Sequence, residues 1–371
     1  MKMLSIVGAR PNFMKVAPFL RQPGIEHVLV HTGQHYSLEM SGQFFSELGI
    51  KPPDYNLDVK GSQGQQIGRA ISRLEPVLEK EKPDWVVLYG DVNAVCSGAI
   101  MATRLGIPVA HVEAGLRSGD WSMPEEQNRV IADMLSQRHF VESEGDFDNL
   151  RQEAIEPWKA VIVGNIMIDT LEYEREAASQ LSVNDIMEEE VGEFAVMTLH
   201  RPSNVDNPER LRRILEEVRD SDAPRVIFPV HPRTWEVLTK FKILEDFQAG
   251  VLERMGLGFR TIGPAPRISF ISPVSYREML KLNMEARMFI TDSGGLQEEC
   301  CVLGTPCVVV RDTTERPVTL FQNDGTCLLT GSCPGGVKEW VNEAVNMERK
   351  PKIPPLWDGK TAERIARNLL S

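Results

Sequence analysis

The chain has 371 residues, 42% hydrophobic and 25% charged, which favours a globular protein of two domains. Its net charge of −12 argues against nucleic acid or an anionic membrane as the main partner, because both require a basic surface. No apolar run reaches the roughly 18 residues of a spanning helix, and a strand begins within three residues of Met1. The six cysteines form no CxxC pair, so we expect buried free thiols, no metal site and a cytoplasmic protein.

Apolar strands and helices alternate through the first half of the chain. The expected strands are residues 3–7, 27–31, 85–88, 108–112 and 161–163, with a helix after the loop at 8–12 and another near 65–81. Continuous apolar strands separated by helices predict a parallel sheet that is covered on both faces.

The charged stretch 171–193 is expected to lead into a second unit of the same kind. Its strands are expected at 194–199, 226–230, either 261–263 or 269–271, then 288–290 and 307–310, and residues 356–370 read as an amphipathic helix. We therefore expect an α/β protein with Rossmann-like domains at residues 1–172 and 173–355. The helix at 356–371 is expected to pack back on the first domain.

Polar residues follow the predicted strands at their carboxyl ends, where open parallel sheets bind ligands. They are Arg10, His35, Asp91, Glu113, His200, His231, Ser293 and Arg316. Two sheets facing each other would bring them to one interdomain cleft. The alternative is a set of unrelated loop residues.

The segment 288–299 is the most informative of these junctions. Gly294 and Gly295 would let the backbone approach a ligand, and the first N–H groups of the following helix form an anion site. The carboxylates of Glu298 and Glu299 could reach sugar hydroxyls. This pattern suits a nucleoside diphosphate, although a simple strand–helix turn capped by Ser293 is the alternative.

A set of motifs then carries a resemblance over the whole chain. They are GARPNFMK (8–15), TGQH (32–35), GDVN (90–93), HVEAGLRS (111–118), MPEEQNR (123–129), HR (200–201), PVHP (229–232), TDSGGLQEE (291–299) and RDTTERP (311–317). Together they resemble the non-hydrolysing UDP-N-acetylglucosamine 2-epimerases. The resemblance implies a GT-B-like fold, a homodimer, and interconversion of UDP-GlcNAc and UDP-ManNAc for cell-surface polysaccharide synthesis, with no dissociable cofactor.

The family reaction is thought to eliminate UDP across C1–C2 and add it back through a 2-acetamidoglucal. Such a route needs carboxylates as acid and base, and cations and helix N-termini around the diphosphate. By resemblance the catalytic candidates are Asp91, Glu113, Glu125 (or Glu126) and His200. The substrate-binding candidates are Arg10, Lys15, Met279 near uracil, Ser293, Gly294, Gly295, Glu299 at the ribose, and Arg316.

Each assignment has a structural alternative. Asp91 could form an Asx turn, and Glu125 could belong to a capping box with Ser122. Arg316 could pair only with Glu315, and Glu298 is expected to be the more exposed neighbour of Glu299. Some relatives also bind UDP-GlcNAc as an activator. The matching residues here are Gln34, His35 and Arg69, for which a plain loop–helix contact is the alternative.

Other functions stay open beside the main one. Asn12, Val92, Met279 and Val318 depart from the common family pattern, which raises the prospect of a modified UDP-GlcNAc derivative as substrate. A hydrolysing epimerase that releases UDP and ManNAc shares the motifs, and a sugar-nucleotide sensor is the non-enzyme alternative. No strand is followed by the GxGxxG fingerprint of a dehydrogenase.

Overall fold

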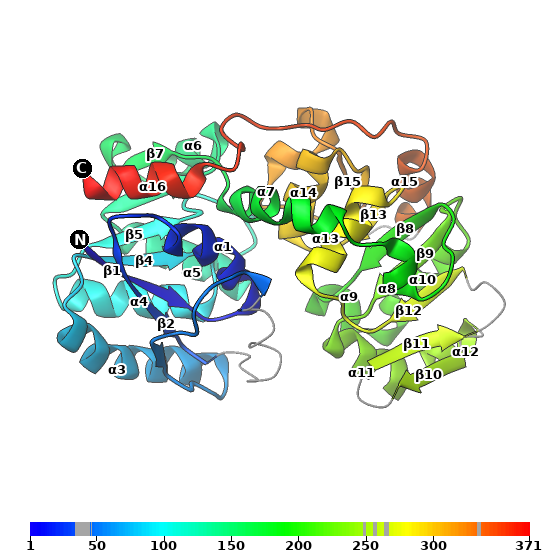
Figure 1. Ribbon diagram of the computed structural model, residues 1–371, viewed down its shortest axis with the longest axis horizontal. Coiled ribbons are helices and arrows are strands. Elements are labelled where there is room, and N and C mark those ends of the chain that lie inside the picture. Colours follow the sequence, from blue (N-terminus) through cyan, green and yellow to red (C-terminus); the bar gives the residue numbers. More distant parts are fainter. Residues whose placement is uncertain (34–44, 46, 248–249, 255–257, 263–266, 332–334) are drawn as a thin grey trace. The chain divides into compact units, whose positions relative to one another are not determined.

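The computed structural model describes residues 1–33, 45, 47–247, 250–254, 258–262, 267–331 and 335–371. The chain forms two compact units (Figure 1). Unit 1 contains Met1–Tyr173 and Pro354–Ser371, and unit 2 contains Glu174–Ile353. The passage between them lies inside helix α7 (Ile166–Ser179), so the charged stretch at 171–193 is largely helical, with α8 (Val183–Met187) following.

Among the described residues, the sheet of unit 1 is parallel throughout, in the order β3-β2-β1-β4-β5-β6-β7. Its strands are β1 (Lys2–Val7), β2 (Glu26–His31), β3 (Tyr55–Asn56), β4 (Trp85–Tyr89), β5 (Val109–Val112), β6 (Arg138–Val141) and β7 (Ala160–Ile162). β1, β4 and β5 are neighbours, so the ends of three strands that are distant in sequence lie together at the centre of one edge.

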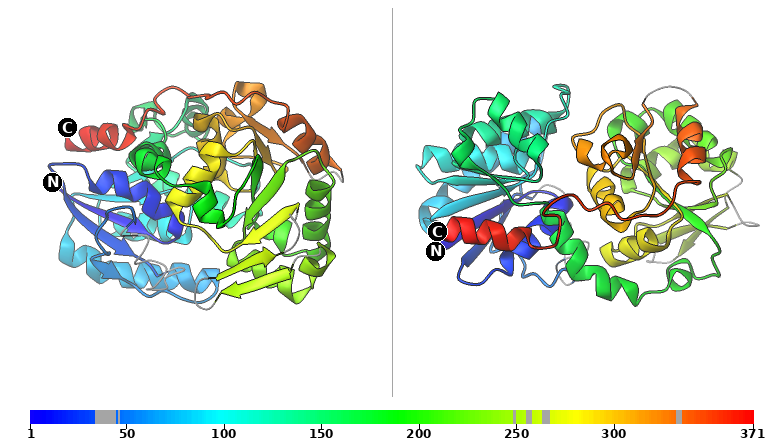
Figure 2. Two further views of the ribbon diagram at one scale, coloured as in Figure 1. Left: turned by 45° about the vertical axis from the view of Figure 1, so that its right-hand side comes forward. Right: turned by 90° about the horizontal axis from the view of Figure 1, so that it is seen from above.

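Helices cover both faces of this sheet (Figures 1 and 2). They are α1 (Arg10–Leu20), α3 (Gln63–Glu81), α4 (Asn93–Arg104), α5 (Pro124–Leu135), α6 (Glu144–Gln152) and the short η1 (Pro157–Lys159). Side chains alternate along each strand, so Leu4, Ile6 and Leu88 join the core formed with α3, α4 and α5. Burial on both faces explains the continuous apolar strands in the sequence.

The chain returns to unit 1 after unit 2, and its helix α16 (Thr361–Leu370) packs beside α1 (Figures 1 and 2). The expected helix at 356–370 was too long, because Leu356 adopts φ +66° and Gly359 φ +76°, which are incompatible with an α-helix. Trp357, which lies between them, is buried and donates from Nε1 to the carbonyl of Glu142 at 3.2 Å. Asp169 accepts the N–H groups of Thr361 and Ala362 at the start of α16.

The sheet of unit 2 has the order β10-β11-β12-β9-β8-β13-β14-β15 in the described part of the chain. Its strands are β8 (Phe194–Thr198), β9 (Arg225–Pro229), β10 (Gly250–Arg254), β11 (Gly258–Ile262), β12 (Ile268–Ile271), β13 (Phe289–Thr291), β14 (Cys307–Val309) and β15 (Cys327–Leu329). Of the two positions expected for a strand after β9, β12 is parallel to its neighbour β9, whereas β10 and β11 form an antiparallel extension.

The helices of unit 2 also form two layers. They are α9 (Pro202–Val205), α10 (Pro208–Arg219), α11 (Pro232–Lys240), α12 (Ile243–Asp246), α13 (Tyr276–Glu285), α14 (Gly294–Leu303), α15 (Gly336–Ala344), η2 (Pro317–Thr319) and η3 (Phe321–Asn323). One core joins alternate strand residues to α10, α11 and α15, and the other joins the remaining residues to α8, α13 and α14. The expected α/β class with two parallel-sheet domains is confirmed.

Cysteine burial agrees with the expectation of free thiols. Cys96, Cys300, Cys301, Cys307 and Cys327 are buried and unoxidised, and Cys333 lies outside the described residues. Of the helices that the structure describes, none is long and apolar enough to cross a bilayer.

Candidate active site

The first cluster lies at the carboxyl edge of the unit 1 sheet. Lys15 lies in α1 and Glu113 directly follows β5. The Nζ of Lys15 donates to Oε2 of Glu113 at 2.5 Å, and the two residues are only 7% and 2% exposed. Gly90, after β4, lies against both: a Cβ there would be 2.8 Å from Lys15 Nζ and 3.3 Å from Glu113 Oε2. Asn12 fixes the loop over this edge, since its Oδ1 accepts from Gly8 N and its Nδ2 donates to the Tyr89 carbonyl.

Glu113 occupies a strained backbone conformation. Its φ is +66°, which costs a residue other than glycine about 1–3 kcal/mol. The flanking chain is anchored by two hydrogen bonds, from Ala114 N to the Phe140 carbonyl and from Gly115 N to Asp133 Oδ2. A buried charge in a strained conformation is typical of a functional site rather than of a structural turn.

Asp91 belongs to a second group of charges at the same edge. Its half-buried carboxylate pairs with Arg129 Nη2 in α5, and Arg129 Nη1 also donates to Glu126 Oε2 at 2.8 Å. The side chain of Asn128 donates to the Asp91 carbonyl at 2.9 Å. Asp91 and α5 are therefore tied together, a role for Arg129 that motif reading did not assign.

Glu125 and Glu126 have different environments. Glu126 is buried and accepts the N–H groups of Ser118 and Gly119 at 2.9–3.1 Å. Burial alone would raise the pKa of Glu126, but these N–H groups and Arg129 lower it. Glu125 is half-buried in the first turn of α5. The N-cap residue of this helix is Met123, with no side-chain hydrogen bond, so the alternative of a capping box with Ser122 is wrong.

Beneath this edge lies a buried pair that the sequence did not reveal. His111 Nδ1 is 2.6 Å from Asp133 Oδ1, and its Nε2 is 2.8 Å from the Gly90 carbonyl. Burial of Asp133 opposes its ionisation, yet His111 and Arg117 lower the pKa of its carboxyl to about 2. The pair connects the strand ends next to Asp91 and Glu113 to α5.

The second cluster lies at the carboxyl edge of the unit 2 sheet, where β8 and β13 end side by side. Asp292 follows β13, and its buried carboxylate accepts from the backbone N–H groups of His200 and Arg201 after β8. The ring Nδ1 of His200 is 2.9 Å from Asp292 Oδ1. Ser293 begins α14 with no side-chain capping bond, so the simple capped turn that was the alternative at this position is wrong.

Beside the start of α14 lies a buried network of arginines and glutamates. Glu315 accepts from Arg316 Nη1 at 2.7 Å, Arg311 Nη2 at 2.6 Å and Arg201 Nη2 at 3.4 Å. Burial favours the neutral carboxyl, but the three guanidinium groups hold the pKa of Glu315 well below its usual range. A Cβ on Gly294 would lie 2.7 Å from Arg316 Nη1 and 2.9 Å from Glu315 Oε1, so any larger residue would displace this ion pair.

Arg316 also pairs with Glu298, which corrects one expectation. Glu298 is fully buried rather than exposed, because α14 is enclosed on nearly all sides. The expected alternative for Arg316, a contact with Glu315, exists together with this second contact.

Glu299 is the other buried acid of α14. Its Oε1 accepts from the Tyr276 hydroxyl at 3.1 Å, and its Oε2 is buried with no hydrogen-bond partner among the described residues. Burial raises the pKa of Glu299 to about 8, Glu298 adds to the rise, and Tyr276 opposes it. Half-buried Met279, on the same helix as Tyr276, packs against the core under α14.

The remaining candidates are Arg69, His231 and three residues whose side chains the structure does not describe. Arg69 is exposed and donates to the Lys60 carbonyl at 2.5 Å, while Gln34, His35 and the side chain of Arg10 lie outside the described residues. His231 begins α11, where its Nδ1 accepts from Arg233 N at 3.2 Å, and its ring lies 5.7 Å from that of His200. Within the described ranges, no group of three or more potential ligands could hold a metal ion.

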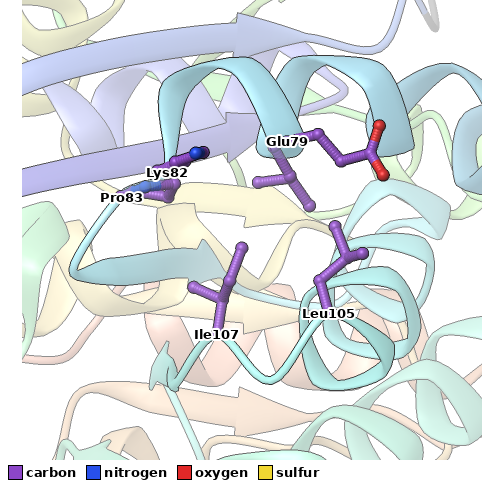
Figure 3. Close-up of a pocket in the computed structure, with 6 residues that line it drawn as sticks. Glu79, Lys82, Pro83, Leu105 and Ile107 are labelled. Atoms are coloured by element: carbon purple, nitrogen blue, oxygen red, sulfur yellow. The ribbon is translucent and has the colours of Figure 1, made fainter.

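A hollow of about 460 Å³ lies elsewhere in unit 1 (Figure 3). It is lined by Leu78, Glu79, Lys82, Pro83, Leu105 and Ile107, before the amino ends of β4 and β5. None of the candidate residues lines it, and we do not assign the active site there.

The chain is similar to known proteins over nearly its whole length. The family model described as UDP-N-acetylglucosamine 2-epimerase matches residues 19–370. The UDP-N-acetylglucosamine 2-epimerase of Methanocaldococcus jannaschii is 40% identical over 379 residues, covering 100% of this chain and 99% of the relative. Its crystal structure in complex with UDP-GlcNAc and UDP has a TM-score of 0.88 at 39% identity, covering 100% and 99% of the two chains.

A further relative acts on a different sugar. The UDP-2,3-diacetamido-2,3-dideoxy-D-glucuronate 2-epimerase of Pseudomonas aeruginosa is 40% identical over 326 residues, covering 85% of this chain and 84% of the relative. The family match spans nearly the whole chain, and the fold is GT-B-like with Rossmann-like domains. The chain therefore belongs to the UDP-N-acetylglucosamine 2-epimerase family of isomerases.

Proposed function

We propose that the protein interconverts UDP-GlcNAc and UDP-ManNAc without net hydrolysis, by eliminating UDP and adding it back. The observation that carries this is the buried pair of Lys15 and Glu113, which lies in a strained segment beside Gly90 and Asp91. Desolvated charges of this kind suit proton transfer at a weakly acidic carbon.

In the proposed elimination a carboxylate removes the C2 proton, a C1–C2 double bond forms, and the C1–O bond breaks. UDP leaves with the electron pair of that bond. In the return step a proton adds to the opposite face of C2 and the UDP oxygen bonds to C1. Glu113, Asp91 and Glu125 are the proposed acid and base groups of unit 1, and Lys15 supports the charge of Glu113.

Unit 2 is the proposed site of the nucleotide. Ser293, Gly294, Gly295 and the start of α14 would hold the diphosphate, because unpaired N–H groups and a helix dipole favour an anion. His200 and Arg316 would complete this site. Arg10, in unit 1, is proposed as a further substrate-binding residue. Glu299 would accept the ribose hydroxyls and Met279 would cover the base, as a polarisable thioether can.

The remaining parts of the proposal rest on the family resemblance. They are a homodimer in the cytoplasm that supplies cell-surface polysaccharide synthesis and needs no cofactor. Activation by a second UDP-GlcNAc at Gln34, His35 and Arg69 is part of the same proposal.

A modified sugar is the second candidate substrate. The Pseudomonas aeruginosa diacetamido-glucuronate epimerase has the same 40% identity to this chain as the Methanocaldococcus jannaschii enzyme, over 326 rather than 379 residues. Both substrates undergo the same change at C2, so the candidate acid and base groups would keep their roles.

The test is an NMR time course of enzyme and UDP-GlcNAc in D2O, with the diacetamido-glucuronate nucleotide in parallel. We expect UDP-ManNAc to form, and at equilibrium both UDP-GlcNAc and UDP-ManNAc should carry deuterium at C2. Release of UDP with free ManNAc would identify a hydrolysing enzyme instead. Epimerisation with no deuterium would rule out proton abstraction, and turnover of the diacetamido sugar alone would reassign the substrate.

A further inference from the structure

The side chains of His200 and Asp292 meet at adjacent strand ends. β8 and β13 pair in parallel with Thr198 opposite Thr291, and the hydroxyl oxygens of these threonines are 2.8 Å apart. Beyond the strands, the Asp292 side chain is fully buried while that of His200 is 41% exposed. The short distance between His200 Nδ1 and Asp292 Oδ1, 2.9 Å, thus joins a buried acid to a half-exposed ring.

Asp292 is surrounded by hydrogen-bond donors. Its oxygens accept from His200 N at 3.1 Å, Arg201 N at 2.9 Å and Asn204 Nδ2 at 3.1 Å. Burial by itself would raise the pKa of Asp292, but the hydrogen bonds from His200, Arg201 and Asn204 lower it. The carboxylate is therefore ionised, and at 2.9 Å it favours a proton on the His200 Nδ1 that faces it.

The ionised Asp292 carboxylate favours one of the two ring nitrogens of His200 as the site of the proton. A neutral imidazole has one donor and one acceptor nitrogen, and the partner of one nitrogen fixes the state of the other. A proton on Nδ1, 2.9 Å from Asp292 Oδ1, leaves the lone pair on Nε2 of a ring whose side chain is 41% exposed. Among the described residues, the neighbouring charged or titratable groups include Arg201, whose Nε donates to the Asp292 carbonyl and whose Nη2 pairs with Glu315, and the His231 ring at 5.7 Å.

We infer that Asp292 is a positioning residue for His200. It holds the ring in the Nδ1–H form, so that Nε2 faces the substrate, and its charge balances the imidazolium that forms when Nε2 is protonated. The role of the protonated Nε2, donation to the departing diphosphate, rests on the proposed function. The inference about the ring itself does not.

The variant Asp292→Asn separates this role from support of the backbone. Its amide oxygen can still accept from the N–H groups of His200 and Arg201, but its NH2 group would then face His200 Nδ1. The ring should change to the Nε2–H form, with Nδ1 as acceptor. Thr198→Val is the matched control, because it disturbs the same strand pair without touching the ring.

Nitrogen NMR of the ¹⁵N-labelled, ligand-free enzyme reads the ring directly, and His200→Gln identifies its signals among the seven histidines. We expect a protonated Nδ1 and unprotonated Nε2 in the parent and in Thr198→Val, and the reverse in Asp292→Asn. A parent enzyme with the proton on Nε2 would overturn the inference, as would an Asp292→Asn variant whose signals match those of the parent.

Kinetics then show whether Asp292 acts through His200. We expect Asp292→Asn to lower kcat by about 10²–10⁴-fold with little change in KM, in the range for displaced acid–base groups. In a protein that already carries His200→Gln, adding Asp292→Asn should lower kcat little further. Equal losses in both backgrounds would mean that Asp292 serves only the backbone. If His200→Gln keeps parental kcat, the proposed role of His200 fails, and the nitrogen spectra alone decide the role of Asp292.

Discussion

The raised pKa of Glu299 predicts that UDP binding releases a proton. Burial in α14 raises the pKa of Glu299 to about 8, with Glu298 adding to the rise, and among the described residues its Oε2 has no hydrogen-bond partner. Ribose hydroxyls that donate to Glu299 would favour its ionised form and lower this pKa on binding. At pH 7, one unit below the free pKa, about 0.9 of the sites carry the proton that binding would expel.

Isothermal titration of UDP in buffers of different ionisation enthalpy measures this proton. We expect the number of protons released per UDP bound to fall from about 0.9 at pH 7 to about 0.1 at pH 9. The affinity for UDP should rise as the pH approaches 8 and stay level above it. Glu299→Gln removes the contribution of this residue but keeps that of UDP itself, so the difference between the two proteins isolates it. The exposed Glu245→Gln is the control for a lost charge.

Tyr276→Phe provides a directional check on the same carboxyl. The Tyr276 hydroxyl opposes the rise in the pKa of Glu299, so its removal should shift the decline in proton release to higher pH. The same raised pKa means that Glu299 contributes fully to the free energy of unfolding below about pH 4.5. This contribution is lost as the pH rises through about 8. The reasoning would be refuted if Glu299→Gln released as many protons as the parent at pH 7.

The other predictions concern unit 1. Glu113→Gln should lower turnover by at least about 100-fold while UDP still binds, which steady-state rates and calorimetry would show; near-normal rates would make Glu113 a structural residue. Glu125→Gln should act in the same way, whereas Glu126→Gln should mainly lower the free energy of unfolding by about 1–3 kcal/mol, and the reverse pattern in urea titrations would exchange their roles. Trp357→Phe should lower the free energy of unfolding by about 1 kcal/mol, because it removes the hydrogen bond from the indole to the Glu142 carbonyl, and unchanged stability would mean that this bond makes no net contribution.

The sequence predicted the parallel sheets well because their strands are buried on both faces and therefore continuously apolar. Chain order also predicted that polar residues would gather at the carboxyl edges. The antiparallel strands β10 and β11 did not stand out, since residues 250–262 carry charges within short apolar runs.

The partners of the candidate residues could not be predicted in the same way. Lys15 and Glu113 are 98 positions apart, and their contact depends on β1, β4 and β5 being neighbours. The sequence did not predict the burial of Glu298, because α14 is enclosed on nearly all sides and therefore lacks the polar face that would show which residues are exposed. Asp292 stands in a motif that was recognised, but its partner His200 is on another strand 92 positions away.

The late return of the chain to unit 1 has a consequence for its synthesis. Residues 354–371 complete the core around Trp357 and α16, yet roughly 180 residues of unit 2 are made between Tyr173 and Pro354. At about 5–20 residues per second, the ribosome needs about 10–40 s to cover that distance. Throughout this interval the surfaces of α1 and Asp169 that α16 will cover are exposed on the nascent chain. Unit 2 can therefore reach its final form first, although it is translated second.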